Sequence, residues 1–172
     1  MSKNKRKQLS IDEHYVRPQA SWEQMKAAKN IGQTVYIYGV TGTGKTSFAV
    51  DFLGRKRYQY VSVSDTGIEE IAAMVSEKTE LQTTLVIDDL HLLETWEERS
   101  LYGQLIEELS VRKDVWLILI SRASIPKWLK SVHIRHFFVT IGEEQLFLTE
   151  KEQEIYLEKW EVYPTEAASK RI

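Results

Sequence analysis

Hydrophobic and polar positions follow two different periods along the chain. Short runs rich in β-branched and aromatic residues occur at 34–38, 58–64, 83–88, 114–121 and 136–141. Longer stretches of helical period lie between them, at 21–30, 45–54, 67–78, 96–113 and 125–131. Strands that alternate with helices in this way are typical of a parallel sheet covered on both faces. The pattern therefore predicts an α/β fold with five strands.

Individual elements carry more specific signals. The apolar run Leu85–Ile87 is almost uninterrupted and stops at two carboxylates, which predicts a strand buried on both faces. Ser21 and Gln24 have the spacing of a capping box and predict the start of the first helix. The helix at 96–113 is expected to face the sheet with an apolar stripe made of Leu101, Tyr102, Leu105, Ile106 and Leu109.

The alternation of strand and helix patterns stops after Gly142. An acidic helical stretch starts near Thr149 and Gln153, and a second helical stretch follows Pro164. We therefore divide the sequence into three parts. They are a basic N-terminal tail at 1–14, a nucleotide-binding core at 15–143, and the start of a helical lid at 144–172, which looks truncated.

Composition limits the number of domains, the partners and the cellular location that we expect. The 172 residues, 42% of them hydrophobic, suit one globular domain, and a formal net charge of −2 gives no global attraction to nucleic acid or membrane. We expect no direct DNA binding by this segment; the basic start at residues 1–10 is a solvated tail or a weak phosphate contact. Cysteine is absent and no apolar stretch approaches about 20 residues, so we expect a cytoplasmic protein without a membrane partner.

The sequence "GVTGTGKT" at 39–46 carries the most specific chemistry. Gly39, Gly44, Lys45 and Thr46 satisfy the pattern G-x-x-x-x-G-K-[ST], with a predicted strand before it and a helix after it. Backbone N–H groups of such a loop bind phosphate oxygens, Lys45 reaches the β and γ phosphates, and the Thr46 hydroxyl binds Mg²⁺. The residues expected to bind nucleotide here are Gly39, Val40, Thr41, Gly42, Thr43, Gly44, Lys45, Thr46 and Ser47.

Charged residues at the ends of two later strands can complete a catalytic site. Asp88 is placed to orient Mg²⁺ or its waters, and Asp89 to polarise the water that attacks the γ phosphate. Alternatively, this pair only caps a following helix. Arg122 ends its strand where it would face the γ phosphate, or else it forms an ordinary surface salt bridge. His91 is at least as compatible with packing or solvent exposure as with function.

Together, "GVTGTGKT", "LVIDDLHLL", "LILISRASIP" and "QLFLTEKE" resemble the ATP-binding domain of STAND-class signal-transduction ATPases, in the group found in large LuxR-type transcriptional regulators similar to the maltose regulator. The resemblance implies the strand order 5-1-4-3-2, with the strand ending in Ser121 and Arg122 beside the phosphate-loop strand. It also implies that Val16, Arg17 and Pro18 lie over the adenine. Such regulators continue into a lid, a helical-repeat sensor and often a DNA-binding module, which 172 residues cannot contain.

Three functions agree with these features. The first is a switch ATPase that binds ATP or ADP with Mg²⁺, hydrolyses slowly, and signals to further domains or by self-association in the ATP state. The second is a small-molecule phosphotransferase, although "GEEQLFLTEKEQE" is acidic where a cationic lid would be expected. The third is a non-enzymatic interaction module that keeps nucleotide as a structural component. The sequence favours the first.

Overall fold

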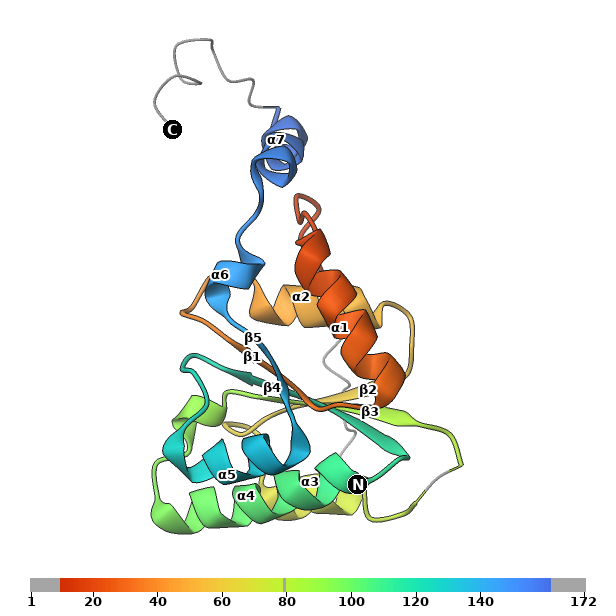
Figure 1. Ribbon diagram of the computed structural model, residues 1–172, viewed down its shortest axis with the longest axis vertical. Helices are drawn as coiled ribbons and strands as arrows, with labels where there is room; N and C mark the ends of the chain where they lie inside the picture. The colour runs from red at the N-terminus through yellow and green to blue at the C-terminus, as the bar shows by residue number, and fades with distance from the viewer. Residues whose placement is uncertain (1–9, 79, 162–172) are drawn as a thin grey trace.

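A computed structural model describes residues 10–78 and 80–161 of the protein (Figure 1). Strands and helices alternate along the chain, so the predicted α/β fold is confirmed. The elements are α1 (Gln19–Ile31), β1 (Val35–Tyr38), α2 (Lys45–Leu53), β2 (Tyr58–Ser62), α3 (Ile68–Met74), β3 (Thr83–Asp88), the 3₁₀ helix η1 (Leu90–Leu92), α4 (Trp96–Val111), β4 (Val115–Ser121), α5 (Lys127–His136), β5 (Val139–Ile141), α6 (Glu143–Leu146) and α7 (Glu150–Lys159).

The five strands form one sheet in the order β2-β3-β4-β1-β5, and every pair of neighbours is parallel. This is the strand order that the family resemblance implied. β4 lies between β1 and β3, and Tyr38 at the end of β1 is in register with Ser121 at the end of β4. The carboxyl ends of these three strands therefore meet at one edge of the sheet.

Helices cover both faces of the sheet, with α1 and α2 on one side and α3, α4 and α5 on the other (Figure 1). The alternation of side chains along β3 divides the core between these faces. Val86 packs with Phe48, Phe52 and other residues of the α1–α2 side, whereas Leu85 and Ile87 belong to the cluster under α4. Leu85, Val86 and Ile87 are all buried, as predicted for a strand enclosed on both sides.

Two local predictions about helices were wrong. α1 starts two residues before Ser21, after Pro18, so Ser21 lies inside the helix and is buried. Its hydroxyl donates to the backbone carbonyl of Gln145 and therefore ties α1 to α6 instead of capping α1. Leu101 was assigned to the buried stripe of α4 but is 43% exposed, because the face that packs against the sheet is formed by the other four predicted residues.

Boundaries differ most around α3, α5 and β5. α3 ends at Met74, short of the predicted residue 78, and the Arg112 guanidinium donates to the carbonyls of Val75 and Glu77 just beyond that end. α5 continues to His136, past the predicted residue 131, and ends where Phe137 has a left-handed backbone conformation. His136 is thus the last residue of the helix, 137–138 connect it to β5, and β5 is correspondingly shorter than predicted.

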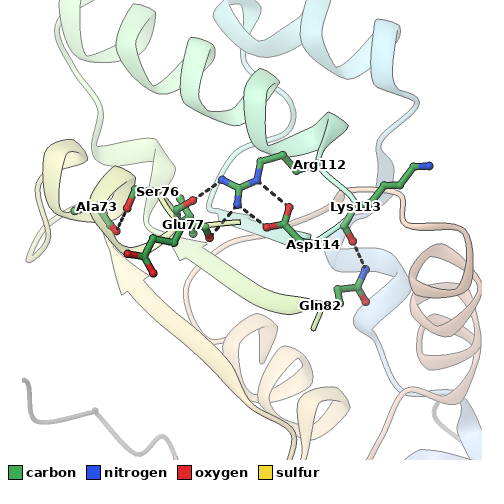
Figure 2. Close-up of polar contacts among 8 residues, drawn as sticks. Ala73, Ser76, Glu77, Gln82, Arg112, Lys113 and Asp114 are labelled. Atoms are coloured by element: carbon green, nitrogen blue, oxygen red, sulfur yellow. Dashed lines mark hydrogen bonds and ion pairs between the residues drawn. The ribbon is translucent and has the colours of Figure 1, made fainter. Parts of the chain in front are cut away.

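A polar network holds the amino end of the sheet together (Figure 2). Arg112 follows α4 and forms a two-pronged contact with Asp114, with nitrogen–oxygen distances of 3.0 and 2.6 Å. The backbone carbonyl of Asp114 accepts from the N–H of Thr83 at 2.8 Å, and the Gln82 side chain donates to the Lys113 carbonyl at 3.5 Å. The network joins the ends of α3 and α4 to the starts of β3 and β4.

The acidic helix α7 packs on the segment that precedes α1. Thr149 forms a capping box with Glu152, one residue before the predicted Gln153. The Glu152 carboxylate accepts from the N–H of Gln19 at 2.8 Å, Lys159 donates to the Tyr15 carbonyl at 2.7 Å, and His14 stacks on Trp160. The predicted stretch after Pro164 and the basic residues 1–9 lie outside the described residues. None of the helices within 10–78 and 80–161 has the length and apolar character needed to cross a membrane.

Candidate functional site

The loop 39–46 leaves the carboxyl end of β1 and turns into α2. The N–H of Gly39 donates to the Ser121 carbonyl at 3.3 Å, which fixes the start of the loop against the end of β4. Glycine is required at this position because a Cβ would lie 2.6 Å from the Cβ of Glu143. At the other end, Gly44 has φ 80° and directly precedes α2, in the left-handed conformation that glycine adopts at least cost.

The amino end of α2 faces a pocket of about 360 Å³. No side chain caps this end and no acidic residue occupies its first turn, so its N–H groups and positive dipole are available to an anion. Most of the predicted site residues line the pocket. Its lining consists of Thr41, Gly42, Gly44, Lys45, Thr46, Ser47, Asp88, Asp89, His91, Ser121 and Arg122.

Lys45 is the first residue of α2 and folds back onto the loop. Its Nζ donates to the Val40 carbonyl at 2.9 Å and lies 3.4 Å from the Thr43 hydroxyl. Burial lowers the pKa of the Lys45 ammonium, and the nearby Asp88 carboxylate opposes this effect. The ammonium is therefore held inside the loop by neutral oxygens, which it can exchange for phosphate oxygens.

Asp88 is the last residue of β3 and is buried, with 6% of its surface exposed. Because side chains alternate along a strand, Asp88 points to the same face as Val86, toward α2. Its Oδ2 accepts from the Thr46 hydroxyl at 3.0 Å and from the Tyr60 hydroxyl at 2.6 Å, and its Oδ1 from the Asp89 N–H at 2.6 Å. Burial and this carboxylate raise the pKa of the Tyr60 phenol, which stays a donor.

Asp89 has a strained backbone, with φ 64° in the left-handed region that non-glycine residues rarely adopt. Its side chain makes no capping hydrogen bond to η1, and α4 is capped by Thr95 instead. The alternative that this acid pair only caps a helix therefore fails. The Asp89 carboxylate accepts from the Ser62 hydroxyl at 2.6 Å, which anchors it beside the pocket.

Arg122 and His91 complete the wall of the pocket. Within the part of the chain that the structure describes, the exposed Arg122 side chain makes no hydrogen bond or ion pair, so the surface salt bridge considered above is not found. Both ring nitrogens of His91 are shielded from solvent and have no hydrogen-bond partner among the described residues. Burial lowers the pKa of His91, and the positive charge of Arg122 lowers it further.

Six of the predicted nucleotide-binding residues do not line the pocket. Gly39 lies under the Glu143 side chain, and the Thr43 hydroxyl donates to the Val40 carbonyl at 2.9 Å. Arg17, in the segment expected over the adenine, instead pairs with Asp51 of α2 at 2.8 Å. The role of Val16, Arg17 and Pro18 at the adenine stays a prediction.

Three residues at the site were missed at the level of sequence. Tyr60 and Ser62 hold the two carboxylates from β2, and the Glu143 carboxylate accepts from the Val40 N–H at 3.0 Å. Tyr60 and Ser62 are two residues apart in a predicted strand and therefore lie on the same face of it. This spacing identifies them as neighbours of the two carboxylates only once the register between β2 and β3 is known. Nothing local points to Glu143, which lies 103 residues from its partner.

No family model matches the chain, and no curated protein matches it in sequence. Solved structures do resemble it. They include ORC1 of Aeropyrum pernix in complex with DNA (16% identity, TM-score 0.60, 86% of this chain and 50% of that chain) and a DNA replication initiation factor (18%, 0.59, 96% and 57%). AMPPCP-bound DnaA from Aquifex aeolicus is a third (18%, 0.56, 92% and 56%).

At these identities the likeness shows the fold alone. The α/β topology, with a glycine-rich loop between β1 and α2, is that of a P-loop NTPase domain. The chain spans about half the length of these structural neighbours.

Proposed function

We propose that this protein is an ATP-binding switch domain of a signal-transduction or transcriptional regulator, with Mg-ATP at the loop 39–46 and slow hydrolysis. The observation that carries the proposal is the 3.0 Å hydrogen bond between Thr46 and Asp88, directly beside the Lys45 ammonium. The Lys45 ammonium and the Thr46 hydroxyl, both in the first turn of α2, meet the Asp88 carboxylate from the end of β3 at the uncapped end of that helix.

The donor set fits a magnesium nucleotide. Mg²⁺ prefers oxygen ligands and is usually held by one or two carboxylates together with substrate phosphates. Thr46 and Asp88 provide such oxygens, while Lys45 and the N–H groups at the start of α2 suit the phosphates. When bound, the ion would neutralise charge on the phosphate oxygens.

Hydrolysis is assigned to Asp89 and Arg122. The Asp89 carboxylate lies in the pocket wall and accepts the proton, or polarises the bond, of a water aimed at the γ phosphate. The unpaired Arg122 guanidinium stabilises negative charge that develops on that phosphate. The Ser62 hydroxyl donates a hydrogen bond to the Asp89 carboxylate and holds this base toward β2. Because the carboxylate is partly engaged by that bond, we expect hydrolysis to be slow.

A connection between the loop and the lid supports the switch role. Glu143 is the first residue of α6, and its carboxylate binds the Val40 N–H at the base of the phosphate loop. A phosphate entering this loop changes the charge near Glu143, and the change reaches α6 and α7. In the proposed arrangement, residues 144–172 begin a helical lid, and the 16–18 segment, held on α2 through Arg17, adjoins the adenine.

The resemblance to STAND-class regulators and the nucleotide analogue bound to the neighbouring DnaA structure both support this proposal. The proposal has two levels, nucleotide binding and the role in a regulator, and they have different support. Nucleotide binding rests on the geometry of the loop, whereas the regulator role, the further domains and self-association in the ATP state rest on the resemblance.

Calorimetry of the full chain with ATP and ADP, with and without Mg²⁺, tests the first level. We expect one nucleotide per chain and tighter binding of ATP when Mg²⁺ is present. Phosphate release is expected well below about 1 s⁻¹, the lower end of ordinary enzyme turnover. Absence of any Mg²⁺-dependent binding would end the proposal, and transfer of phosphate to a metabolite in place of water would favour a phosphotransferase.

A further inference from the structure

A second and larger cavity adjoins the nucleotide pocket. We name it the α4–α5 cavity; it has a volume of about 730 Å³ and lies between η1, α4, the end of β4 and α5. This volume is within the range of small-molecule sites in proteins, roughly 300–1,000 Å³. The nucleotide does not require it, because the loop 39–46 turns into α2, which covers the opposite face of the sheet (Figure 1).

Two indole rings line this cavity. Trp96, the first residue of α4, is 83% exposed, which is unusual for so large an apolar side chain. Trp128, in the first turn of α5, is half-buried and contributes to the opposite wall. An aromatic or other flat apolar group can bury surface against both rings.

The same cavity is positively charged. Lys127 begins α5, and within the described residues it makes no hydrogen bond or ion pair. Arg99 donates through Nε to the Leu93 carbonyl at 2.8 Å, but its terminal nitrogens have no partner in the described part of the chain. Among the described residues that line the cavity, the one carboxylate, Glu107, is already paired with Arg135 at 2.7 Å.

The amino end of α5 adds to this positive potential. The helix starts after Pro126 without a side-chain cap and without an acidic residue in its first turn. A lysine in that first turn is unfavourable beside the positive end of the helix dipole unless an anion accompanies it. The charges and the uncapped helix therefore favour the same ligand group, an anion.

His91 and Ser121 line both the α4–α5 cavity and the nucleotide pocket. The imidazole ring lies between the two spaces, with both nitrogens shielded and without partners among the described residues. A neutral imidazole has one donor and one acceptor, and each is costly to leave unpaired when buried. A turn of the ring toward either space would bring one of them to a ligand or a bound water there, so the occupancy of one space can affect the other.

We infer that the α4–α5 cavity is a second ligand site, which takes a small organic anion with an aromatic ring and is coupled to the nucleotide pocket through His91. The indoles of Trp96 and Trp128 bind the ring, and Lys127, Arg99 and the amino end of α5 bind the anionic group. The coupling rests on the proposed nucleotide site, whereas the ligand site itself does not.

The probe is naphthalene-2-carboxylate, compared with the neutral naphthalene-2-carboxamide, and binding is followed by the five indole N–H signals in a ¹H–¹⁵N spectrum of the full chain. Trp96→Phe and Trp128→Phe assign the two signals of the cavity. We expect these two to shift with a dissociation constant on the order of 1 mM for the carboxylate. The amide should bind about fivefold to tenfold more weakly.

Substitutions separate the cavity from general adsorption. Lys127→Gln should weaken the carboxylate about fivefold, whereas Lys130→Gln, on the exposed side of the same helix and outside the cavity lining, should have no effect. The site is refuted if Trp22 and Trp160 shift as much as Trp96 and Trp128, if no indole shifts, or if Lys127→Gln binds the probe like the unaltered chain. None of these measurements needs nucleotide, so failure of the proposed function leaves them valid.

A second titration tests the coupling. With the probe near saturation, the affinity for a non-hydrolysable ATP analogue should change by roughly fivefold or more, and the analogue should change probe affinity by the same factor. His91→Phe removes both ring nitrogens while keeping an aromatic ring and should bring that factor close to one. An unchanged analogue affinity in the original chain, or a coupling that survives in His91→Phe, would overturn the role of His91.

Discussion

Charged side chains form an ion pair at the amino end of the sheet, whereas those at the carboxyl end are not paired with each other. At the amino end, Arg112 meets Asp114 directly, with side-chain exposures of 10% and 14%, and uses its remaining donors on backbone carbonyls (Figure 2). At the carboxyl end, Lys45 and Arg122 line the same pocket as Asp88 and Asp89, yet no ion pair joins them within the described residues. Hydroxyls of Thr46, Tyr60 and Ser62 hold the acids instead.

The difference shows which end serves stability and which serves binding. Charges that are paired with each other are already compensated, and an incoming ligand would have to break that pair. Carboxylates held by neutral hydroxyls keep their charge available, and a lysine held by carbonyls keeps its own. The carboxyl end thus retains uncompensated charge of both signs, which a magnesium nucleotide matches.

The largest effect is expected from Asp89→Asn, which removes the charge at nearly constant size. Hydrolysis should fall by about 10²- to 10⁴-fold, the usual contribution of a general base, while nucleotide affinity stays roughly constant. Single-turnover phosphate release measures the first and calorimetry the second. Glu97→Gln, an exposed acid in α4, is the control. Unchanged phosphate release would exclude Asp89 as the general base and favour a module that only binds nucleotide.

The next largest effect is expected from Arg112→Ala, which removes the ion pair with Asp114 at the amino end of the sheet. Removing one partner of a buried ion pair should lower the free energy of unfolding by about 3–5 kcal/mol, measured by urea denaturation. Arg135→Ala breaks the matched pair with Glu107, whose side chains are 53% and 40% exposed, and should cost no more than about 1 kcal/mol. If both variants lose equal stability, burial is not what makes the Arg112 contact important.

How far the sequence predicts the molecule depends on whether a signal is local. The loop 39–46 is one contiguous pattern between a strand and a helix, so its place in the fold follows from spacing alone. Asp88 was found because a buried apolar run ends there, and parallel strands bring such ends to one edge of the sheet.

Contacts between distant segments could not be predicted in this way. Tyr60 reaches Asp88 only because β2 and β3 pair in one particular register, and Glu143 reaches Val40 only because α6 crosses the loop. The capping signal at Ser21 failed for a related reason, since a serine that fits a helix start locally was used in a contact with Gln145, 124 residues away.

A smaller effect than either of the first two is expected from Lys45→Ala. Loss of one charge-assisted contact to phosphate should weaken ATP by about 1.5–3 kcal/mol, or about ten- to a hundredfold, in calorimetry. Stability should not fall, because the ammonium makes no ion pair among the described residues and its burial already lowers its pKa. Lys151→Ala, exposed in α7, is the control, and equal weakening in both variants would contradict the loop contact.

The smallest change in nucleotide affinity is expected from Arg122→Ala, which tests most directly whether the charges at the carboxyl end are unpaired. The guanidinium is exposed and makes no hydrogen bond or ion pair within the described residues of the free protein, so the thermal unfolding temperature should stay unchanged. An exposed charge pair is worth up to about 1 kcal/mol, so ATP should weaken by no more than about fivefold. ADP lacks the γ phosphate and should bind the variant as well as it binds the original chain. Equal weakening of ATP and ADP would place Arg122 away from the terminal phosphate, and a fall in stability would show that this arginine is paired like Arg112 at the opposite end.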